Sequence, residues 1–553
     1  MGSLVVGLTQ VGLLILALAV VYRPFGDYMA RVYTSDEHWR VERALYRVVR
    51  IDGDSSQRWT TYAAGVLGFS LVSVALLYLM QRLQHLLPLS FGRGPVDPAT
   101  AFNTAVSFVT NTNWQSYVPE QVLGHTVQMA GLTVQNFVSA AVGMAVAIAL
   151  VRGFAGAGTD RIGNVWVDIT RGVTRILLPI ALVASVVLVA LGGAMTLASG
   201  IEVTGIDGHA YTIASAPIAG QEVIKELGTN GGGVLNANSA HPLSNPGGLS
   251  NLLEIFLILV IPLCLTRTFG AMVGDRRQGT VLLSVMVALT VVLTGVTWWA
   301  ETHPNGTAAL AAGGAMEGKE ARFGEYLSGL FAVATTGTST GAVNAMHDSF
   351  TGLGGGVTLL NMLLGEVAPG GVGSGLYGML MLAVIAVFLA GLMVGRTPEY
   401  LGKKLGRKEI TAAAISILAM PTAVLLGAGT ALALPGTLEA LNNSGAHGLS
   451  EVLYAYASTG NNNGSAFAGL TATSDFFQST LGIAMLVGRF VPILAVLALA
   501  GALAQQQRVP ATAGTLPTTG PLFAGLLGGT VVLVAALTFL PALALGPVAE
   551  ALA

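Results

Sequence analysis

Four polar, glycine-rich strings hold the residue types in this chain that could do chemistry. They read TNTNWQ at 110–115, GTNGGG at 228–233, TGTSTG at 336–341 and TGNNNG at 459–464. Aligning the strings places in one column Gln115, Gly231, Gly341 and Gly464. The members of this column recur at intervals of 116, 110 and 123 residues, and a recurrence of that length indicates one structural module used four times.

The strings are suited to binding a dehydrated monovalent cation. Glycine adopts φ > 0 readily, so successive carbonyl oxygens can turn toward a shared axis. Rings of such oxygens replace the hydration shell of a potassium ion. The strings contain no Asp or Glu, the ligands that calcium-type ions favour. The alternative is four ordinary flexible loops, which the shared register argues against.

We expect the filter to be formed by backbone carbonyls from all four strings. Gln115 replaces the glycine of its column, so its side chain is expected to make the filter asymmetric and to tune affinity. The column two residues earlier holds Asn113, Thr229, Ser339 and Asn462. The complete set of expected filter residues is Asn111, Thr112, Asn113, Gln115, Thr229, Asn230, Gly231, Gly232, Thr338, Ser339, Thr340, Gly341, Asn461, Asn462, Asn463 and Gly464.

Membrane-spanning helices must position these strings. The chain has 553 residues, of which 53% are hydrophobic and 10% are charged, whereas soluble proteins carry about 25% charged residues. This composition excludes a soluble enzyme, and the net charge of −2 argues against a nucleic-acid partner. Ten apolar runs are long enough to cross a bilayer core of about 30 Å. They lie at 3–22, 59–80, 127–151, 176–199, 251–274, 278–300, 353–395, 410–433, 476–503 and 521–545.

The runs predict an all-α polytopic membrane protein with four helix–pore loop–helix modules around a central pore. An extra helix is expected at each end, so that the units are 1–58, 59–152, 176–275, 278–396, 410–504 and 521–553. Most of the 26 Lys and Arg residues lie in alternate loops, which should therefore be cytoplasmic, with both termini outside. The basic loop 23–58 is the expected docking surface for partners.

Two features are expected to prevent a straight leak through such a pore. The seventh run is interrupted by a segment that contains Gly370, Gly371, Gly373, Ser374 and Gly375. An interrupted membrane segment is typical of a broken helix at a functional site, although a simple kink is the alternative.

The second feature is an arginine, Arg489, inside the ninth run. A charge inside a span usually faces a cavity or a partner. At about 10 Å and an effective dielectric near 20, it would repel a filter ion by about 1.7 kcal/mol. Glu366 either pairs with Arg489 as a strut or lines the ion's exit. Arg396, at the cytoplasmic end of the seventh run, is a further candidate for pore control.

The strings TNTNWQ, GTNGGG, TTGTSTGAVN and STGNNNGSA, with GRTPEYLGKK at 395–404, resemble a known family. This family is the potassium-binding subunit of the bacterial Kdp-type potassium-transporting P-type ATPase. The Trk/Ktr/HKT potassium transporters are similar more distantly. The resemblance covers nearly the whole chain.

The resemblance implies high-affinity potassium uptake at the bacterial plasma (inner) membrane. It implies that this subunit selects K+, that a separate P-type catalytic subunit hydrolyses ATP, and that small single-span accessory subunits complete the complex. It also implies a gating loop beneath the filter and a sideways exit for K+ into the ATPase subunit. Membrane lipid is an expected contact, and neither nucleotide nor nucleic acid is expected on this chain.

Two other function classes are alternatives to this interpretation. A stand-alone secondary transporter or channel of the Trk/Ktr/HKT type would share the filter, but the tenth run, Gln115, Arg489 and the GRTPEYLGKK run favour the pump subunit. A polytopic membrane enzyme would need a positioned acid or nucleophile, which the strings lack. The segment from Gly313 to Lys319 matches a phosphate-binding loop, but Glu320 stands where Ser or Thr should hold magnesium.

Overall fold

The structure is a computed structural model that describes residues 2–304, 315–510 and 515–552. Its described residues include ten helices that are long and apolar enough to cross a membrane. Helices are expected here because lipid offers no partner for backbone N–H and C=O groups, which a helix satisfies internally. The ten candidate spans are Leu4–Thr34 in α1, Trp59–Arg82 (α3), Val127–Ala155 (η2 and α6), Val165–Ala190 (α7, η3 and α8), Gly248–Met272 (α10), Arg276–Thr302 (α11), Ser374–Met393 (α15), Arg407–Ala433 (α16), Asp475–Gln505 (α19) and Pro521–Leu552 (α20, η6 and α21).

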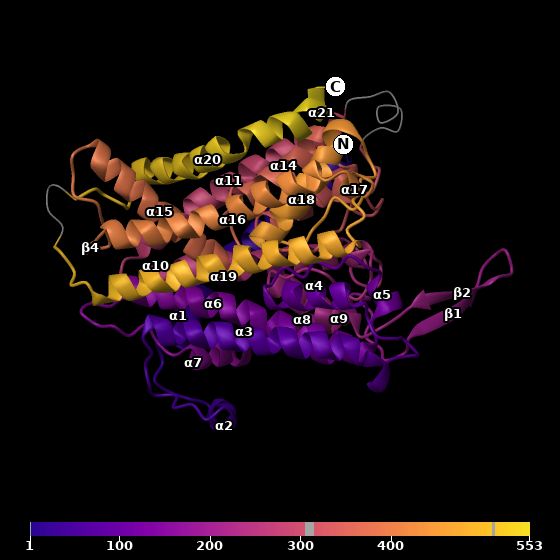
Figure 1. The fold of residues 1–553 in the computed structure, drawn as a ribbon, viewed down its shortest axis with the longest axis horizontal. Coiled ribbons are helices and arrows are strands. Elements are labelled where there is room, and N and C mark those ends of the chain that lie inside the picture. The colour runs from indigo at the N-terminus through magenta and orange to yellow at the C-terminus, as the bar shows by residue number, and fades with distance from the viewer. Residues whose placement is uncertain (1, 305–314, 511–514, 553) are drawn as a thin grey trace.

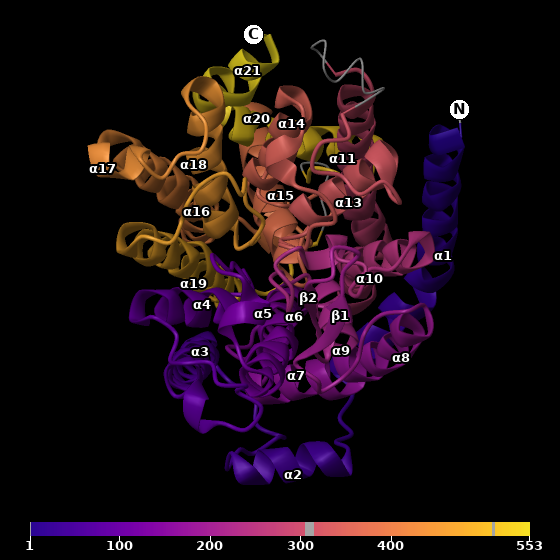
Figure 2. The same cartoon turned by 90° about the vertical axis from the view of Figure 1, so that its right-hand side faces the viewer.

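Four similar helix groups surround one centre, as Figure 2 shows in an end-on view. Each group contains an outer helix, a short pore helix and an inner helix, in the order expected from the repeated strings. The outer helices are α3, α8, α11 and α16, and α1 and α20 lie at the margin of the ring. The four pore helices are α4 (Pro98–Val109), α9 (Ile218–Leu227), α13 (Gly324–Thr336) and α18 (Gly445–Asn461). The predicted all-α membrane fold is confirmed.

Burial separates the inner helices from the outer ones. In the third candidate span, Val127–Ala155, 83% of the apolar window is buried, whereas only 11% is buried in the first, Leu4–Thr34. The inner helices α6, α10, α15 and α19 therefore form the core and hold the pore helices in place. α1 presents most of its surface outward, as a lipid-facing helix does.

Two spans extend more than ten residues beyond a predicted end. α1 (Gly2–Thr34) continues past residue 22, and the fourth candidate span (Val165–Ala190) begins before residue 176. The added helical turns contain charged residues, two of which are paired. Asp27 pairs with Arg267 of α10 at 2.8 Å, and Arg175 pairs with a carboxylate on α2 at 2.5 Å.

The seventh apolar run is not one helix. It folds as α14 (Gly352–Leu363) and α15 (Ser374–Met393), separated by a non-helical break over residues 364–373. Gly365, Gly370 and Gly373 adopt positive φ values of 86°, 94° and 85° in this break. The predicted interruption is therefore present as a broken helix, and a simple kink is contradicted.

Short elements mark the two ends of the molecule. The antiparallel hairpin of β1 (Gly200–Thr204) and β2 (Ala210–Ala214) extends from the end that also carries both termini (Figure 1). The helix α2 (Arg40–Val48) and the hairpin of β3 (Glu399–Tyr400) and β4 (Lys403–Lys404) lie toward the opposite end. The remaining short helices are η1 (Gln84–Leu86), α5 (Pro119–Val122), η4 (Asn238–Ala240), η5 (His347–Ser349) and α17 (Pro435–Leu438).

A buried ion pair joins α6 to α7. Arg152 donates from Nη1 and Nη2 to the two carboxylate oxygens of Asp168, at 2.6 and 2.8 Å. The Asp168 side chain is only 1% exposed, and Tyr62 of α3 donates its hydroxyl to the same carboxylate at 2.9 Å. Three helices therefore meet at one buried charge.

We expect Arg152→Met to destabilise the protein by about 3–5 kcal/mol, because it leaves the Asp168 carboxylate buried without its cation. Thermal unfolding of the purified chain in detergent measures this loss. Arg161→Met is the matched control, since Arg161 pairs with Asp160 at an exposed position and such pairs contribute about 0–1 kcal/mol. Equal melting of the two variants would contradict this role for the buried pair.

Candidate functional site: an ion-selective filter

Each pore helix ends in the same way. Within one to three positions of each helix end, a residue adopts a left-handed conformation: Asn111 (φ 68°), Thr229 (φ 45°), Ser339 (φ 53°) and Asn462 (φ 61°). The next amide then reaches back to a carbonyl in the last turn, in the pairs Thr112–Ser107 (2.9 Å), Asn230–Lys225 (2.8 Å), Thr340–Thr335 (3.1 Å) and Asn463–Ser458 (2.8 Å). The segments at the ends of the four pore helices, residues 110–115, 228–233, 337–341 and 462–464, are named filter loops 1, 2, 3 and 4.

This shared cap corrects the alignment of the first loop by two residues. Asn113, and not Gln115, occupies the position of Gly231, Gly341 and Gly464. The prediction that Gln115 replaces a column glycine is therefore wrong. The alignment matched letters, whereas the register is set by where each pore helix ends. Asn113 has φ 59°, a conformation that asparagine adopts more readily than most residues. Of the three glycines, only Gly464, with φ 106°, also has a positive φ.

The four filter loops contact one another in a closed ring. Loop 1 contacts loop 2 through the side chain of Asn111, whose Nδ2 donates to the Thr229 backbone carbonyl at 2.8 Å. Loop 3 contacts loop 2 through the Gly341 amide and the Asn230 carbonyl, at 2.7 Å. The remaining contacts run from loop 4: Asn463 Nδ2 to Thr335 O of the third pore helix at 3.2 Å, and Asn462 Nδ2 to Thr112 Oγ1 of loop 1 at 3.0 Å. The alternative of four independent flexible loops is contradicted.

Two of the glycines are required by the close approach of neighbouring loops. A Cβ on Gly231 would lie 2.6 Å from the Gly341 Cα, and a Cβ on Gly341 would lie 2.7 Å from the Gly464 carbonyl carbon. Real Cβ atoms do not approach so closely, so a larger residue at either position must displace backbone. Small residues at these two positions therefore allow the neighbouring loops to pack closely.

Gln115 braces the outer end of the ring. Its Oε1 accepts a hydrogen bond from the Gly233 amide of loop 2 at 2.8 Å, and its Nε2 donates to the Tyr117 hydroxyl at 3.0 Å. Its side chain thus joins loops 1 and 2, although it does not stand in the glycine column.

A buried lysine supports the same end of loop 2, and the sequence interpretation missed it. Lys225 of α9 is fully buried and donates to Glu222 at 2.7 Å and to Asn238 at 2.9 Å. Asn238 in turn donates from Nδ2 to the Gly232 carbonyl at 2.6 Å. The available signal was a lysine in a short amphipathic stretch directly before a string, because an ionisable residue at membrane depth is rarely there without a role.

The break in the seventh run lies against the inner end of the ring. The Gly370 amide donates to the Gly337 carbonyl at 2.7 Å, and the Val372 amide donates to the Thr229 hydroxyl at 2.9 Å. Gly371 lies against Ser339 in loop 3. The break therefore contacts loops 2 and 3 directly.

The other predicted residues of the break lie where two segments of backbone pack closely together. The Cα atoms of Gly370 and Gly375 lie back to back, and Gly373 lies against Gly143 of α6. Ser374 lines the cavity described below and lies near the Ser339 hydroxyl at 3.5 Å.

Glu366 joins the break to two filter loops. Ser339 of loop 3 donates its hydroxyl to Glu366 Oε2, and Asn463 of loop 4 donates from Nδ2 to Oε1 at 2.9 Å. Both Arg489 and Glu366 are described, and no ion pair of 4.0 Å or less joins them. The alternative of an Arg489–Glu366 strut is therefore contradicted.

A cavity of about 120 Å³ begins directly beneath the ring. Filter residues Ser339, Asn461 and Asn462 line it, together with Glu366 and Arg489. Arg489 is 4% exposed and faces this space from α19. The cavity continues between three helices, through Tyr377 and Met381 of α15, Ser416 and Met420 of α16, and Val534 and Thr538 of α20.

Two further sequence candidates lie elsewhere. Arg396 follows α15 and is exposed beside the β3–β4 hairpin, so the structure does not bring it to the filter or the cavity. Hydropathy placed it at a span end and could not show which way it points. The GxxxxGK-like segment begins at Gly313, within residues 305–314, which lie outside the described part of the chain.

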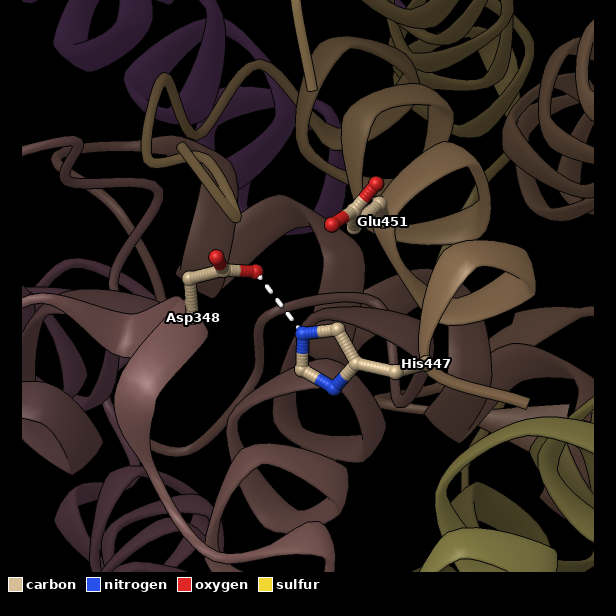
Figure 3. A group of neighbouring side chains, drawn as sticks. All are labelled: Asp348, His447 and Glu451. Carbon is tan, nitrogen blue, oxygen red and sulfur yellow. Dashed lines mark hydrogen bonds and ion pairs between the residues drawn. The ribbon is translucent and has the colours of Figure 1, made fainter. Parts of the chain in front are cut away.

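A cluster formed by His447, Asp348 and Glu550, called the His447 clasp below, lies at the outer end of the molecule near loop 4. His447 bonds through Nε2 to Asp348 at 3.0 Å and through Nδ1 to Glu550 of α21 at 2.9 Å. Figure 3 shows the hydrogen bond between Asp348 and the imidazole, with the Glu451 carboxylate close to both. The hydrogen bonds to Asp348 and Glu550 raise the pKa of His447 from its ordinary 6.5 to about 10. The ring is therefore a cation that ties the C-terminal helix to the pore-helix layer.

These features define a class of protein: a multi-pass, pore-loop transport protein whose filter is built by one chain. The potassium transporter TrkH from Vibrio parahaemolyticus has a similar fold, with a TM-score of 0.55 at 14% sequence identity over 89% of this chain and 96% of that one.

The chain belongs to the KdpA family, potassium-transporting ATPase A subunit, whose family model matches residues 12–552. Relatives named potassium-transporting ATPase potassium-binding subunit are 64% identical in Rhodococcus erythropolis and 63% identical in Nocardia farcinica, each over 98% of both chains. The relative of that name in Kineococcus radiotolerans is 60% identical over 100% of this chain and 99% of its own length.

We expect Gly341→Ala to weaken potassium binding by about 1–3 kcal/mol, because the added methyl group overpacks the ring against loop 4. Titration of the purified chain with KCl by calorimetry measures the change. Gly429→Ala on α16 is the control, since a Cβ there meets no atom within 4 Å. Unchanged binding in Gly341→Ala would show that the ring does not hold the ion.

We expect the His447 clasp to stabilise the C-terminal helix below about pH 6.5 in full and to lose that contribution as the pH rises toward about 10. The sign follows because the folded-state pKa is raised above its ordinary value. Hydrogen exchange of residues 544–552 should therefore accelerate with pH more than intrinsic exchange does. His447→Gln should accelerate it already at neutral pH, whereas His209→Gln, on the exposed β1–β2 turn, should not.

Proposed function

We propose that this chain is the ion-selecting subunit of an ATP-driven potassium-uptake pump. It binds dehydrated K+ through backbone carbonyls of the filter loops and passes the ion to a separate subunit that hydrolyses ATP. The observation that carries the proposal is the closed ring of four loops, each capped by a left-handed residue and stabilised by its neighbours. Membership of the KdpA family and the names of its relatives support the assignment to the Kdp complex.

The proposed orientation puts the filter mouth and both termini outside the cell. The basic loops, which lie toward the opposite end, then face the cytoplasm, as the positive-inside rule requires. The membrane is the bacterial plasma membrane. The proposed partners are the P-type catalytic subunit, which hydrolyses ATP, and small single-span accessory subunits. This chain itself holds no nucleotide in the proposed complex.

The proposed exit is sideways. The cavity beneath the ring does not follow the pore axis but extends between α15, α16 and α20, and its far walls include half-buried residues such as Val534 and Thr538. The break over residues 364–373 lies under loops 2 and 3, where it obstructs a straight path. Both features support delivery of the ion to a partner at the flank of α16 and α20.

Two ionisable residues shape this route. Glu366 bonds to loops 3 and 4 at the ring's inner end, where its carboxyl oxygens lie near a cation that leaves the filter. Arg489 faces the cavity, and its repulsion of a cation favours retention in the filter until the partner opens a path. A pump needs such a barrier, because a pore that is always open would dissipate the gradient.

The experiment that tests the proposal is co-purification of this chain with its membrane partners, followed by ATP hydrolysis assays across a range of K+ concentrations. We expect an ATP-hydrolysing partner whose activity depends on K+ and is lost when the filter is altered. A chain that purifies alone and conducts K+ in liposomes without ATP would instead support the stand-alone transporter.

We expect Gln115→Arg to weaken the apparent potassium affinity by orders of magnitude. Arginine cannot accept the Gly233 N–H bond, a loss of about 1–3 kcal/mol for a buried group, and it adds a positive charge at the ring's outer end. The measurement is K+-stimulated ATP hydrolysis by the complex. Gln115→Met loses the hydrogen bond without the charge, so it should weaken affinity less. Wild-type affinity in Gln115→Arg would argue against the pore.

We expect Arg489→Gln to alter transport while it leaves assembly intact. Removing a repulsion of about 1.7 kcal/mol should raise the rate at which ions leave the filter by about an order of magnitude. Potassium flux per ATP hydrolysed, measured in proteoliposomes, should fall. Arg489→Lys keeps the charge and should retain more coupling than Arg489→Gln. Wild-type coupling in the glutamine variant would remove the barrier role.

A further inference from the structure

The short helix α2 (Arg40–Val48) presents an apolar stripe that no part of the described chain covers. At 3.6 residues per turn, Val41, Leu45 and Val48 share one face. Their exposed fractions are 61%, 44% and 79%. Such a stripe on a fixed helix indicates a surface that is covered in the assembled membrane.

A basic stripe adjoins the apolar one. Arg40, Arg43 and Arg47 share the neighbouring face of α2, and all three are exposed. Arg31, in the last turn of α1, and Arg50, just after α2, add two more exposed positive charges to the same segment. A helix with an apolar face beside an Arg-rich face is typical of segments that lie in a membrane interface.

The third face of α2 packs against the membrane-spanning helices. This contact fixes the orientation of the apolar and basic faces relative to the rest of the protein. Glu42 is fully buried and accepts two hydrogen bonds from Arg175, at 2.5 and 2.6 Å. Tyr46 is 4% exposed and meets the His38 ring edge-on at 5.3 Å. The Arg175 guanidinium also lies over the Trp39 ring, 4.7 Å from its centroid.

The position of α2 matches the depth of the lipid headgroups. α2 packs against α7 (Val165–Arg171), which forms the first turns of the fourth candidate span. That span has 26 residues and is therefore about 39 Å long, whereas the hydrocarbon core is about 30 Å thick. We place the excess of about 9 Å at the start of the span, because Asp168, Arg171 and Arg175 lie there. Figure 2 shows α2 outside the ring of helices, lying across the end-on view.

We propose that α2 is an interfacial helix that binds anionic phospholipid at the end of the molecule opposite the filter. Its apolar stripe inserts at the boundary of headgroups and acyl chains, and its arginines bind the phosphate groups. Clusters of four or more basic residues on an amphipathic helix have this preference, and each contributes about fivefold in affinity for an anionic surface.

The location of α2 favours lipid as the occupant over a partner subunit. α2 and α20 lie on opposite sides of the ring in both views (Figures 1 and 2). The cavity opens toward α15, α16 and α20, so a partner that receives the ion there sits across the molecule from α2. This step rests on the proposed function, and the basic stripe argues independently for an anionic occupant.

Nitroxide labelling tests the depth of the helix. Cys264 is the only cysteine and is 1% exposed, so a cysteine placed on α2 can be labelled selectively. We expect a label at Leu45→Cys to collide with oxygen and to be protected from a water-soluble nickel complex in nanodiscs that contain phosphatidylglycerol. A label at Arg43→Cys should be several-fold more accessible to nickel. Equal nickel access at both positions would overturn the proposal.

Charge variants test the lipid preference. We expect the triple variant Arg40→Gln, Arg43→Gln and Arg47→Gln to lose the protection at residue 45, with headgroup affinity falling about fivefold per arginine removed. The probe is the fraction of phosphatidylglycerol, mixed with phosphatidylcholine, at which protection is half complete. Arg276→Gln with Arg277→Gln, at the exposed start of α11, is the matched control and should not shift this fraction.

Two outcomes distinguish this proposal from the proposed function. Protection of residue 45 that appears only when the ATP-hydrolysing partner is added would identify a protein interface and overturn the lipid assignment. Protection that is independent of phosphatidylglycerol would overturn the anionic preference. Calorimetric K+ binding by each variant reports separately whether the filter is intact, so loss of lipid binding with normal K+ binding leaves the pump assignment standing.

Discussion

The structure depends on one constraint: backbone that is not helical can lie at membrane depth only if other protein groups satisfy it. The filter loops meet this requirement mutually. Asparagine side chains of one loop donate to carbonyls or hydroxyls of the next, as Asn111 does to Thr229 and Asn462 does to Thr112. A single loop of this composition could not remain folded in lipid. The four are stable only as a ring, and this ring is also what gathers their carbonyls.

Charged residues surround the ring without entering it. Lys225 stands behind the outer end and acts on Gly232 through Asn238. Glu366 and Arg489 lie at the inner end, one bonded to the loops and the other facing the cavity. In the proposed function, neutral oxygens of the filter select the ion, and the charges support the ring and line the proposed exit. This arrangement would need no carboxylate ligands, which favour divalent ions.

Much of the fold could be predicted from the sequence, because length, hydropathy and repeated strings report directly on membrane spans and modules. The break in the seventh run was visible for the same reason, since Pro369 and its neighbouring glycines interrupt an apolar run. The errors in the predicted helix ends arose where contacts with residues distant in sequence determine how far a helix extends. Hydropathy could not show that Asp27 and Arg267 neutralise each other within extended helices.

The site shows the same division. The identity of the four strings was predictable, but their register was not, because the caps of the pore helices set it through backbone conformation. The sequence alignment placed Gln115 in a glycine column that Asn113 occupies in the structure. Gln115 nevertheless contacts the ring, because it accepts a hydrogen bond from the Gly233 amide. Arg489 and Glu366 were predicted as deep charges, but only tertiary structure could show that they do not pair.

The bond between Asn462 and Thr112 joins residues 350 positions apart in the sequence. At a synthesis rate of about 5–20 residues per second, the first loop waits on the order of tens of seconds before the last one emerges from the ribosome. A nascent chain therefore has no complete filter for most of its synthesis. Insertion of the final module closes the ring, so the complete filter forms only late in biogenesis.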